Sequence, residues 1–275
     1  MELVVFDLDG TLLDSKSTIS QYTEETLALL RRRGIAYTVA TGRTLHASRA
    51  VLEGHAFELP HAFKNGVVIW HPDDDRFSHV NTLTSAEVAQ VMSACYQNEV
   101  TPFVFTVEGE NDHAVYHAPI RNKAEQFVIN VYTGPRGLKA MPIDALSSDA
   151  RISNISAIGA GEAINAITGS VRNAPHLVAY SGIAVEDDNL CWLDIHHSDA
   201  SKGAAVDTLK SMLGIDRVVC FGDSDNDLSM FASADESYAP ANAKSHVKEQ
   251  ADEVIGHHDE DGIARFLRKR FSLDG

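Results

Sequence analysis

Short apolar runs alternate with segments of helical periodicity at the start of the chain. Residues 3–6 are leucine, valine and phenylalanine, and such a run predicts a buried strand. Apolar positions between residues 22 and 30 follow helical spacing, and Gly34 stands where a helix would end. Residues 36–40 predict a second strand. A strand, a helix and a strand in this order predict a parallel pair joined by a right-handed crossover.

The same order of elements returns near the C-terminus. Residues 206–213 predict a helix that ends at Gly214, and residues 217–221 predict a strand. Each of the three strands is followed at once by polar residues. The carboxyl ends of strands in an open parallel sheet share one edge, where ligands bind. We therefore expect residues about 200 positions apart in the sequence to meet at that edge.

The middle of the chain has a different pattern, in which strand-like stretches predominate. Thr84-x-x-Glu87 is a capping-box pattern and predicts the start of a helix. A second helix is expected at about residues 162–173. Strands are predicted for residues 101–107, 113–116, 152–158, 177–181 and 190–195. This order predicts an antiparallel sheet that carries two helices.

The change of pattern predicts an α/β protein of two domains. We expect a Rossmann-like core with a parallel sheet, formed by residues 1–82 and 195–275. Residues 83–194 would form an inserted α+β domain built on the antiparallel sheet. The chain is long enough for this, since it has 275 residues of which 44% are hydrophobic.

The charge of the chain limits its partners. It has 23 basic and 39 acidic residues, a formal net charge of -16, which repels nucleic acid and anionic membranes. The same charge repels a small phosphate ester, unless a cation and local basic groups reverse the field at the site. No apolar stretch is long enough to cross a bilayer, and no targeting segment precedes the first strand. We expect a cytoplasmic protein with reduced cysteines, since its three cysteines lie far apart.

Two carboxylates stand where the first strand is expected to end. Asp7 and Asp9 are two positions apart, so their side chains can leave the strand on the same side. Gly10 permits the sharp turn that follows. Like charges this close raise the pKa of one group unless a cation intervenes. The pair therefore suits a nucleophile with an acid/base partner, a metal site, or both.

The longer run around these aspartates resembles the haloacid dehalogenase superfamily. Asp7-Leu8-Asp9-Gly10-Thr11-Leu12-Leu13 matches the first motif of that superfamily at every defining position. Three more motifs follow in the same order: Thr41-Gly42-Arg43, Lys202 within Ser201-Lys202-Gly203, and Gly222-Asp223-Ser224-Asp225-Asn226-Asp227. Segments similar to the Cof-type branch are Asn65-Gly66, Ala241-Asn242-Ala243 and Glu260-Asp261-Gly262. In that branch a type IIB cap is inserted between the second and third motifs.

The resemblance implies a magnesium-dependent phosphatase acting on monoesters of small metabolites, such as sugar phosphates. Asp7 would be the nucleophile that forms an aspartyl-phosphate. Asp9 would protonate the leaving alkoxide and then, as a carboxylate, activate water. Magnesium would be held by Asp7, the backbone carbonyl of Asp9 and Asp223. For Asp227, the open alternatives are a metal ligand, direct or through water, a partner that orients Lys202, and an acid at a helix N-terminus.

The resemblance also implies which residues contact phosphate. Thr41, Lys202 and Asn226 would surround the phosphoryl oxygens, and Lys202 would also offset the clustered carboxylates. The remaining residues implied to contact substrate are Leu8, Gly42, Arg43 and Asn65. Two alternatives stay open: a phosphomutase or other phosphotransferase with the same intermediate, and a non-catalytic sensor of phosphorylated ligands. The oligomeric state is left open.

Other metal sites are less well supported by the sequence. Residues 223–227 look like the start of a calcium loop, but Leu228 and Ala234 replace its required glycine and glutamate. Two histidine pairs, His196-His197 and His257-His258, lack an obvious third ligand, and adjacent strand residues point to opposite faces. We therefore expect both pairs to be solvated surface side chains.

Overall fold

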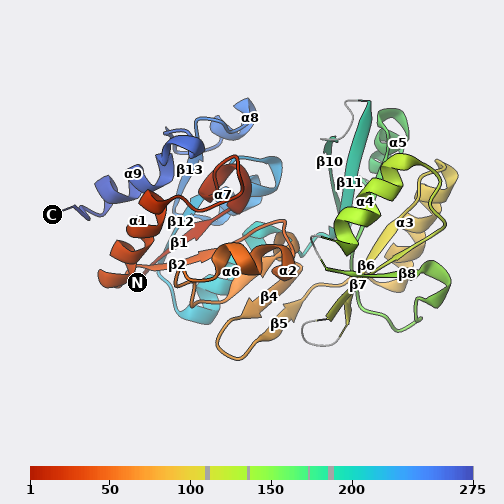
Figure 1. Ribbon diagram of the computed structural model, residues 1–275, viewed down its shortest axis with the longest axis horizontal. Helices are drawn as coiled ribbons and strands as arrows, with labels where there is room; N and C mark the ends of the chain where they lie inside the picture. Colours follow the sequence, from red (N-terminus) through yellow and green to blue (C-terminus); the bar gives the residue numbers. More distant parts are fainter. Residues whose placement is uncertain (109–111, 135–136, 173, 185–188, 275) are drawn as a thin grey trace. The chain divides into compact units, whose positions relative to one another are not determined.

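The protein is described by a computed structural model covering residues 1–108, 112–134, 137–172, 174–184 and 189–274. It divides into two compact units, Met1–His79 with Ala200–Gly275, and Val80–Asp199. Both chain ends lie in the first unit (Figure 1). In the described part of the chain, no helix is both long and apolar enough to cross a membrane.

A parallel sheet forms the centre of the first unit, as the sequence predicted. Its strand order is β14-β13-β12-β1-β2, and every neighbouring pair in this order is parallel. The strands are β1 (Glu2–Phe6), β2 (Ala36–Val39), β12 (Arg217–Phe221), β13 (Glu236–Pro240) and β14 (Glu253–Ile255). Phe6 pairs with Val39 on one side and with Phe221 on the other. The carboxyl ends of β1, β2 and β12 therefore lie level with one another.

Helices flank this sheet, and several of them begin at a side-chain cap. They are α1 (Gln21–Arg32), α2 (Leu45–Leu52), α6 (Lys202–Leu213), α7 (Leu228–Ser233), α8 (Ser245–Lys248) and α9 (Gly262–Arg270). The Ser201 side chain accepts a hydrogen bond from the Ala204 amide and so begins α6. Gly214, in a left-handed conformation with φ of 62°, ends α6. Buried side chains of α6 and α7 pack with alternate residues of β1 and β12 in one apolar core.

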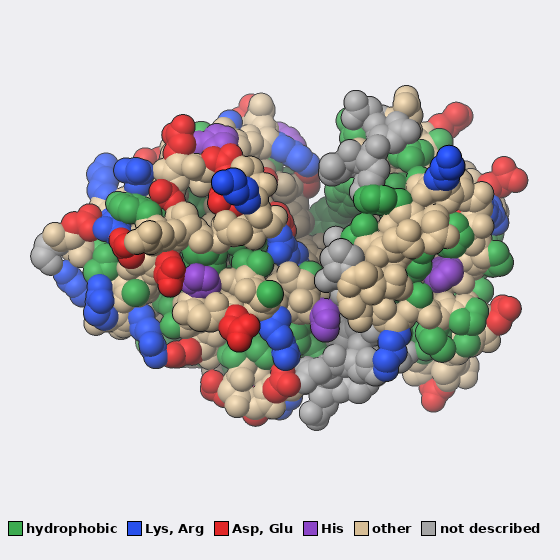
Figure 2. Space-filling view, in the orientation of Figure 1, with side chains coloured by type: hydrophobic (Ala, Val, Ile, Leu, Met, Phe, Trp, Pro, Cys, Tyr) green, Lys and Arg blue, Asp and Glu red, His purple; other side chains and the backbone are tan. Residues whose placement is uncertain are grey.

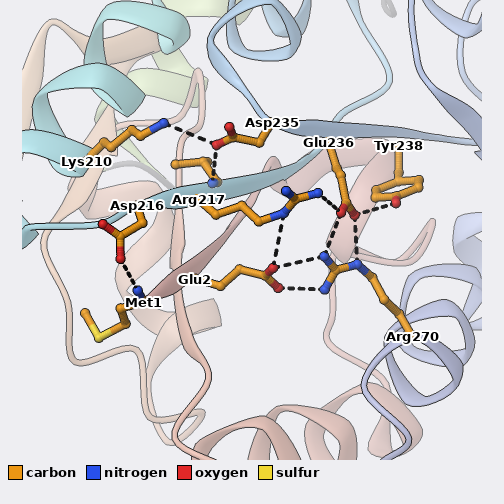
Figure 3. Close-up of polar contacts among 10 residues, drawn as sticks. Met1, Glu2, Lys210, Asp216, Arg217, Asp235, Glu236, Tyr238 and Arg270 are labelled. Carbon is orange, nitrogen blue, oxygen red and sulfur yellow. Dashed lines mark hydrogen bonds and ion pairs between the residues drawn. The ribbon is translucent and has the colours of Figure 1, made fainter.

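A polar network links residues near the two ends of the chain, at the amino ends of the parallel strands (Figure 3). Arg270 of α9 contacts Glu2 of β1 at 2.6 Å (Nη1 to Oε1) and Glu236 of β13 at 2.8 Å (Nε to Oε2). Arg217 and the Tyr238 hydroxyl also donate to Glu236. Elsewhere on the visible face of the first unit, acidic and basic side chains are interspersed (Figure 2).

A smaller sheet with the order β3-β4-β5 completes the first unit. It consists of β3 (His61–Phe63), β4 (Val68–His71) and β5 (Arg76–Val80). The tight turn between β3 and β4, η2 (Lys64–Gly66), has positive φ angles throughout. A side chain at Gly66 would place its Cβ 2.4 Å from the backbone oxygen of Ser201, so glycine allows this turn to approach the start of α6.

The second unit is an α+β fold on a largely antiparallel sheet of order β10-β11-β9-β6-β7-β8. Its strands are β6 (Phe103–Glu108), β7 (Asp112–His117), β8 (Lys139–Pro142), β9 (Ile152–Ala160), β10 (Leu177–Ile183) and β11 (Leu190–His197). Two helices match the predictions, α3 (Ser85–Gln97) and α5 (Gly161–Val171); Asn173, the last residue predicted for the second helix, lies outside the described residues. The sequence did not predict α4 (Lys123–Thr133), and because this helix forms the crossover between β7 and β8, that pair is parallel.

Candidate active site

Asp7 stands directly after β1, at the carboxyl edge of the parallel sheet. Its amide donates to the Phe221 carbonyl over 2.9 Å, and its side chain is buried. The chain then turns through η1 (Leu8–Leu12), where Gly10 has a φ of 72°. A Cβ at Gly10 would lie 2.8 Å from Asp223 Oδ2, so glycine serves both the turn and the close approach.

The fully buried ammonium group of Lys202 joins two carboxylates. Its Nζ lies 2.7 Å from Asp7 Oδ1 and 2.6 Å from Asp227 Oδ1. Burial acts to lower the pKa of Lys202, but the carboxylates of Asp227 and Asp7 act more strongly together and raise it. Lys202 is therefore a permanent cation within the cluster at neutral pH.

The negative charges of the carboxylates in the cluster repel one another, and this repulsion raises pKa values. Burial raises the pKa of Asp7 well above its ordinary value, Lys202 opposes this, and the charges of Asp227 and Asp223 reinforce it. Burial also raises the pKa of Asp223, with Asp227 adding to the effect. One lysine therefore does not fully compensate the carboxylates, and the cluster favours a further cation.

The chemistry of the donors fits magnesium. Asp7, Asp223 and Asp227 each offer a carboxylate oxygen, and these atoms lie within 4.8 Å of one another. Hard oxygen ligands suit Mg²⁺, and the cluster brings no sulfur or imidazole ligand that would favour zinc.

The hydrogen bonds of Asp223 and Asp227 differ, and this difference bears on which of them could bind a metal directly. Asp227 Oδ2 accepts the backbone amides of Asp223 and Ser224, each at 2.9 Å, and its Oδ1 accepts from Lys202. Asp223 accepts from the hydroxyl of Thr11 at 3.1 Å and from that of Ser224 at 2.9 Å. Both oxygens of Asp227 are thus engaged by fixed donors, whereas Asp223 is held by rotatable hydroxyl groups. This arrangement favours Asp223 over Asp227 as a direct metal ligand.

The carboxylate of Asp9 lies in a more exposed environment than that of Asp7. Its carboxylate forms a two-pronged ion pair with Arg43, in which Nε lies 2.6 Å from Oδ2 and Nη2 contacts Oδ1. The Asp9 side chain is 55% exposed, whereas that of Asp7 is 8% exposed. Because β1 ends at Phe6, strand alternation no longer sets the direction of Asp9. The two aspartates therefore have different surroundings and separate partners.

Thr41, Asn65 and Asn226 form a polar group beside the cluster residues. The Thr41 carbonyl accepts the amide of Asn65 at 2.9 Å, and the Asn226 side chain donates to Asn65 Oδ1 at 2.8 Å. A Cβ at Gly42 would lie 3.2 Å from the same Oδ1, so this glycine adjoins the two asparagines. Leu8, which was also predicted to contact substrate, is fully buried.

Two residues outside the predicted set hold the turn that follows Asp7. Asn242 donates to the Gly10 carbonyl over 2.7 Å, and His258 Nδ1 lies 2.7 Å from the Leu13 carbonyl. The amide of His258 in turn donates to Asn242 Oδ1 at 3.2 Å. Asn242 lies in a segment with a Cof-type resemblance, which gave a signal for it; His258 stood out in the sequence only as one of a histidine pair, with nothing to link it to this turn.

Comparisons with known proteins identify the family of the chain. Residues 4–267 match the haloacid dehalogenase-like hydrolase family. The chain is 27% identical to the 5-amino-6-(5-phospho-D-ribitylamino)uracil phosphatase YitU of Bacillus subtilis, with 98% of each chain covered. It is also 27% identical to a phosphoglycolate phosphatase of Methanopyrus kandleri, over 97% of this chain and 96% of that one. A solved haloacid dehalogenase-like hydrolase from B. subtilis superposes with a TM-score of 0.78 at 25% identity, covering 98% of this chain and 99% of the other.

Proposed function

The chain belongs to the haloacid dehalogenase-like hydrolases, and from this premise we propose that it is a magnesium-dependent phosphatase of small phosphate monoesters. The observation that carries the proposal is the contact of the buried Lys202 ammonium with both Asp7 and Asp227. An ion pair that served stability alone would not need a third carboxylate, Asp223, close by. The surplus negative charge suits a site that recruits a cation and then a phosphate group.

Asp7 is assigned as the nucleophile. One carboxylate oxygen would attack phosphorus while the ester oxygen leaves, so that the phosphoryl group is carried on Asp7 as an acyl phosphate. Water would then attack that phosphorus and release inorganic phosphate and the free Asp7 carboxylate. Lys202, fixed on Asp7 Oδ1, orients the carboxylate for this attack.

Asp9 is assigned as the acid and base of the two steps. It would give a proton to the leaving alkoxide and later take one from water. Its ion pair with Arg43 engages both carboxylate oxygens and would have to open before Asp9 could meet the leaving oxygen. An arriving phosphate is an equally good partner for a guanidinium, and we infer that it draws Arg43 away from Asp9. In this scheme substrate binding frees Asp9 for catalysis, because Arg43 turns from Asp9 to the phosphate group.

The metal and phosphate contacts follow from the same cluster. Asp7, Asp223 and the backbone carbonyl of Asp9 would hold magnesium, with Asp227 fixing Lys202 and the turn after β12. When bound, magnesium would supply positive charge that favours ionised Asp7 and offsets charge on the phosphoryl oxygens. The contacts proposed for the phosphate group come from Leu8, Thr41, Gly42, Asn65, Lys202 and Asn226.

The division of labour between the two units is also a proposal. The first unit holds Asp7, Lys202 and Asp223, and we assign catalysis to it. We assign substrate selection to the second unit. Relatives of similar length act on a ribitylaminouracil phosphate and on phosphoglycolate, and we propose a small phosphorylated metabolite as the substrate here too.

The test is release of inorganic phosphate from p-nitrophenyl phosphate and a panel of metabolite phosphates, with no added acceptor. We expect turnover with magnesium, loss of turnover with EDTA, and at least about a thousandfold loss in Asp7→Asn. Asp225→Asn is the matched control, because Asp225 is an exposed acid of the same turn as Asp227 and pairs with Lys244 and His246. It should keep its activity.

The other outcomes separate the alternatives. Transfer of phosphate to an added alcohol without phosphate release would identify a phosphotransferase or mutase. Binding of phosphate esters without turnover across the panel would identify a sensor. Undiminished activity in Asp7→Asn would refute the assignment of the nucleophile.

A further inference from the structure

Three potential metal ligands meet at the turn before α9. His257, His258 and Asp259 each offer one ligand atom, and these atoms lie within 4.8 Å of one another. The two imidazole rings lie 4.8 Å apart at an angle of 36°, so the adjacent histidines do not point to opposite faces. They stand in an irregular turn after β14 and at η5 (His258–Glu260), which removes the strand geometry assumed from the sequence.

The hydrogen bonds of His258 leave one ring nitrogen suited to a metal. Nδ1 lies 2.7 Å from the Leu13 carbonyl, which can only accept, so Nδ1 carries the proton. Nε2 of the neutral ring then carries the lone pair. A histidine that donates its other N–H to a backbone carbonyl is the usual arrangement of a metal ligand, because that bond fixes the ring and its tautomer.

The other two residues are held by hydrogen bonds that they accept. His257 Nδ1 accepts the amide of Asp259 at 3.2 Å, and a metal bound at this nitrogen would replace that long hydrogen bond. Asp259 Oδ1 accepts the amide of Ser15 at 2.7 Å, and Oδ2 lies 3.7 Å from His258 Nε2. Zinc binds nitrogen and oxygen at about 2.0–2.2 Å, which puts two ligands about 3–3.5 Å apart. Shifts of about an ångström would therefore bring these atoms to ligand spacing.

A cation can reach Asp259 from solvent. Asp259 lines a surface pocket together with three further acidic residues and two basic ones, Arg265 and Lys269. Two imidazoles and one carboxylate are the ligands of zinc and related transition metals, whereas magnesium prefers an all-oxygen set. The carboxylate cluster at Asp7 and the group at His258 thus differ in the metal that each would select.

We propose that His257, His258 and Asp259 bind one divalent transition metal ion of the zinc type, at a site of their own in the first unit. The metal would complete a clamp on the segment after Asp7. That segment already reaches the site through Leu13 and Ser15, so residues from both ends of the chain would be held around one ion.

The experiment titrates zinc into the metal-stripped full-length protein against a chromophoric chelator, with millimolar magnesium present to occupy the oxygen cluster. We expect one zinc ion per chain with a Kd of about 10 µM or below. His258→Asn should bind at least tenfold more weakly, because the asparagine amide can still donate to the Leu13 carbonyl but has no counterpart of Nε2. Asp259→Asn should weaken binding in the same direction.

His46→Asn is the control, since His46 is an exposed histidine on α2, and it should bind zinc like the wild type. The thermal shift on adding zinc is a second readout: a rise in Tm in the wild type and His46→Asn, and none in His258→Asn. Equal zinc affinity in the wild type and His258→Asn overturns the proposal, as does binding weaker than about 0.1 mM in the wild type. Neither readout depends on phosphatase activity, so failure of this proposal is distinct from failure of the proposed function.

Discussion

Lys202 donates a hydrogen bond to Asp227 over 2.6 Å, and neither side chain has any exposure to solvent. Removing one partner of a buried ion pair costs about 3–5 kcal/mol, because the other charge is left uncompensated. Loss of the Lys202 charge would leave two buried carboxylates uncompensated, because Asp7 is its second partner. If Lys202 acts in the proposed mechanism, stability and catalysis depend on the same ammonium group.

Replacing Lys202 by methionine should lower both the stability of the protein and its catalytic activity. We expect kcat/KM for a phosphate monoester to fall at least about a hundredfold, and the unfolding free energy to fall by about 3–5 kcal/mol at pH 7. Magnesium should restore part of the lost Tm, since a cation in the cluster replaces some of the missing charge. Phosphatase kinetics and thermal unfolding with and without magnesium measure these effects, and a variant with wild-type KM and kcat would contradict the assignment.

Replacing Asp223 and Asp227 by asparagine should separate a metal ligand from a positioning residue. Asp223→Asn should weaken magnesium activation at least about tenfold, because a charged oxygen ligand is lost. Asp227→Asn should change the magnesium requirement by less than that but lower kcat, because its one acceptor oxygen cannot serve both the backbone N–H groups now on Asp227 Oδ2 and the Lys202 ammonium now on Oδ1. Magnesium titrations of activity and of Tm provide the comparison; the reverse order would make Asp227 the ligand.

Gly66→Ala tests the close approach of the η2 turn to α6. The added Cβ would meet the Ser201 backbone oxygen at 2.4 Å and would also require a φ of 89°. We expect a loss of more than about 2 kcal/mol in urea unfolding and lower activity, because Ser201 begins the helix that carries Lys202. Gly34→Ala is the matched control, with a φ of 69° and no atom within 4 Å of the added Cβ, and should cost about 1 kcal/mol.

The network at Arg270 should make stability depend on pH. The hydrogen bond from Arg270 is the largest cause that lowers the pKa of Glu236, from 4.5 to about 2. A carboxylate whose pKa is lowered by folding stabilises the folded protein at pH values above its pKa in the unfolded chain. This contribution is lost as the pH falls towards the pKa of the folded state. Glu236→Gln should therefore cost about 1–2 kcal/mol at pH 7, a figure reduced for solvent screening, and progressively less between pH 4.5 and about 2.

Urea unfolding at pH 7, 4.5 and 3 compares the two proteins. Glu253→Gln, at an exposed position at the start of β14, is the control and should unfold like the wild type at each pH. A Glu236→Gln deficit that stays constant as pH falls would show that the charge of Glu236 is not its source.

The convergence at the active site could be predicted because topology alone determines it. Asp7 and Asp223 follow neighbouring parallel strands and Lys202 begins the helix that precedes β12, so sequence order and strand direction bring them together. The partner of Asp9 could not be predicted in this way. Beyond the end of β1, the direction of a side chain depends on turn angles that no hydrophobic period encodes, and the two-pronged contact with Arg43 appears in the structure alone.

The second unit shows where a pattern misleads. In α4, Glu125 is buried and Phe127 is 47% exposed, so polar and apolar positions are exchanged at the points that would identify an amphipathic helix. The capping residue Asn122 was the better signal, since its side chain accepts the amide of Glu125. The expectation of a solvated His196 was wrong, because β11 lies between β10 and β9 and this side chain is fully buried.

The two ends of residues 80–199 lie close together, since the Asn81 side chain donates to the Asp199 carbonyl over 3.3 Å. No described strand of the parallel sheet comes from this stretch. Recombination at two points of the gene could therefore replace the whole stretch without rewriting any element that bears Asp7, Lys202 or Asp223. If the second unit selects the substrate, as proposed above, a lineage built in this way would acquire new substrates and keep the residues proposed to break the ester bond.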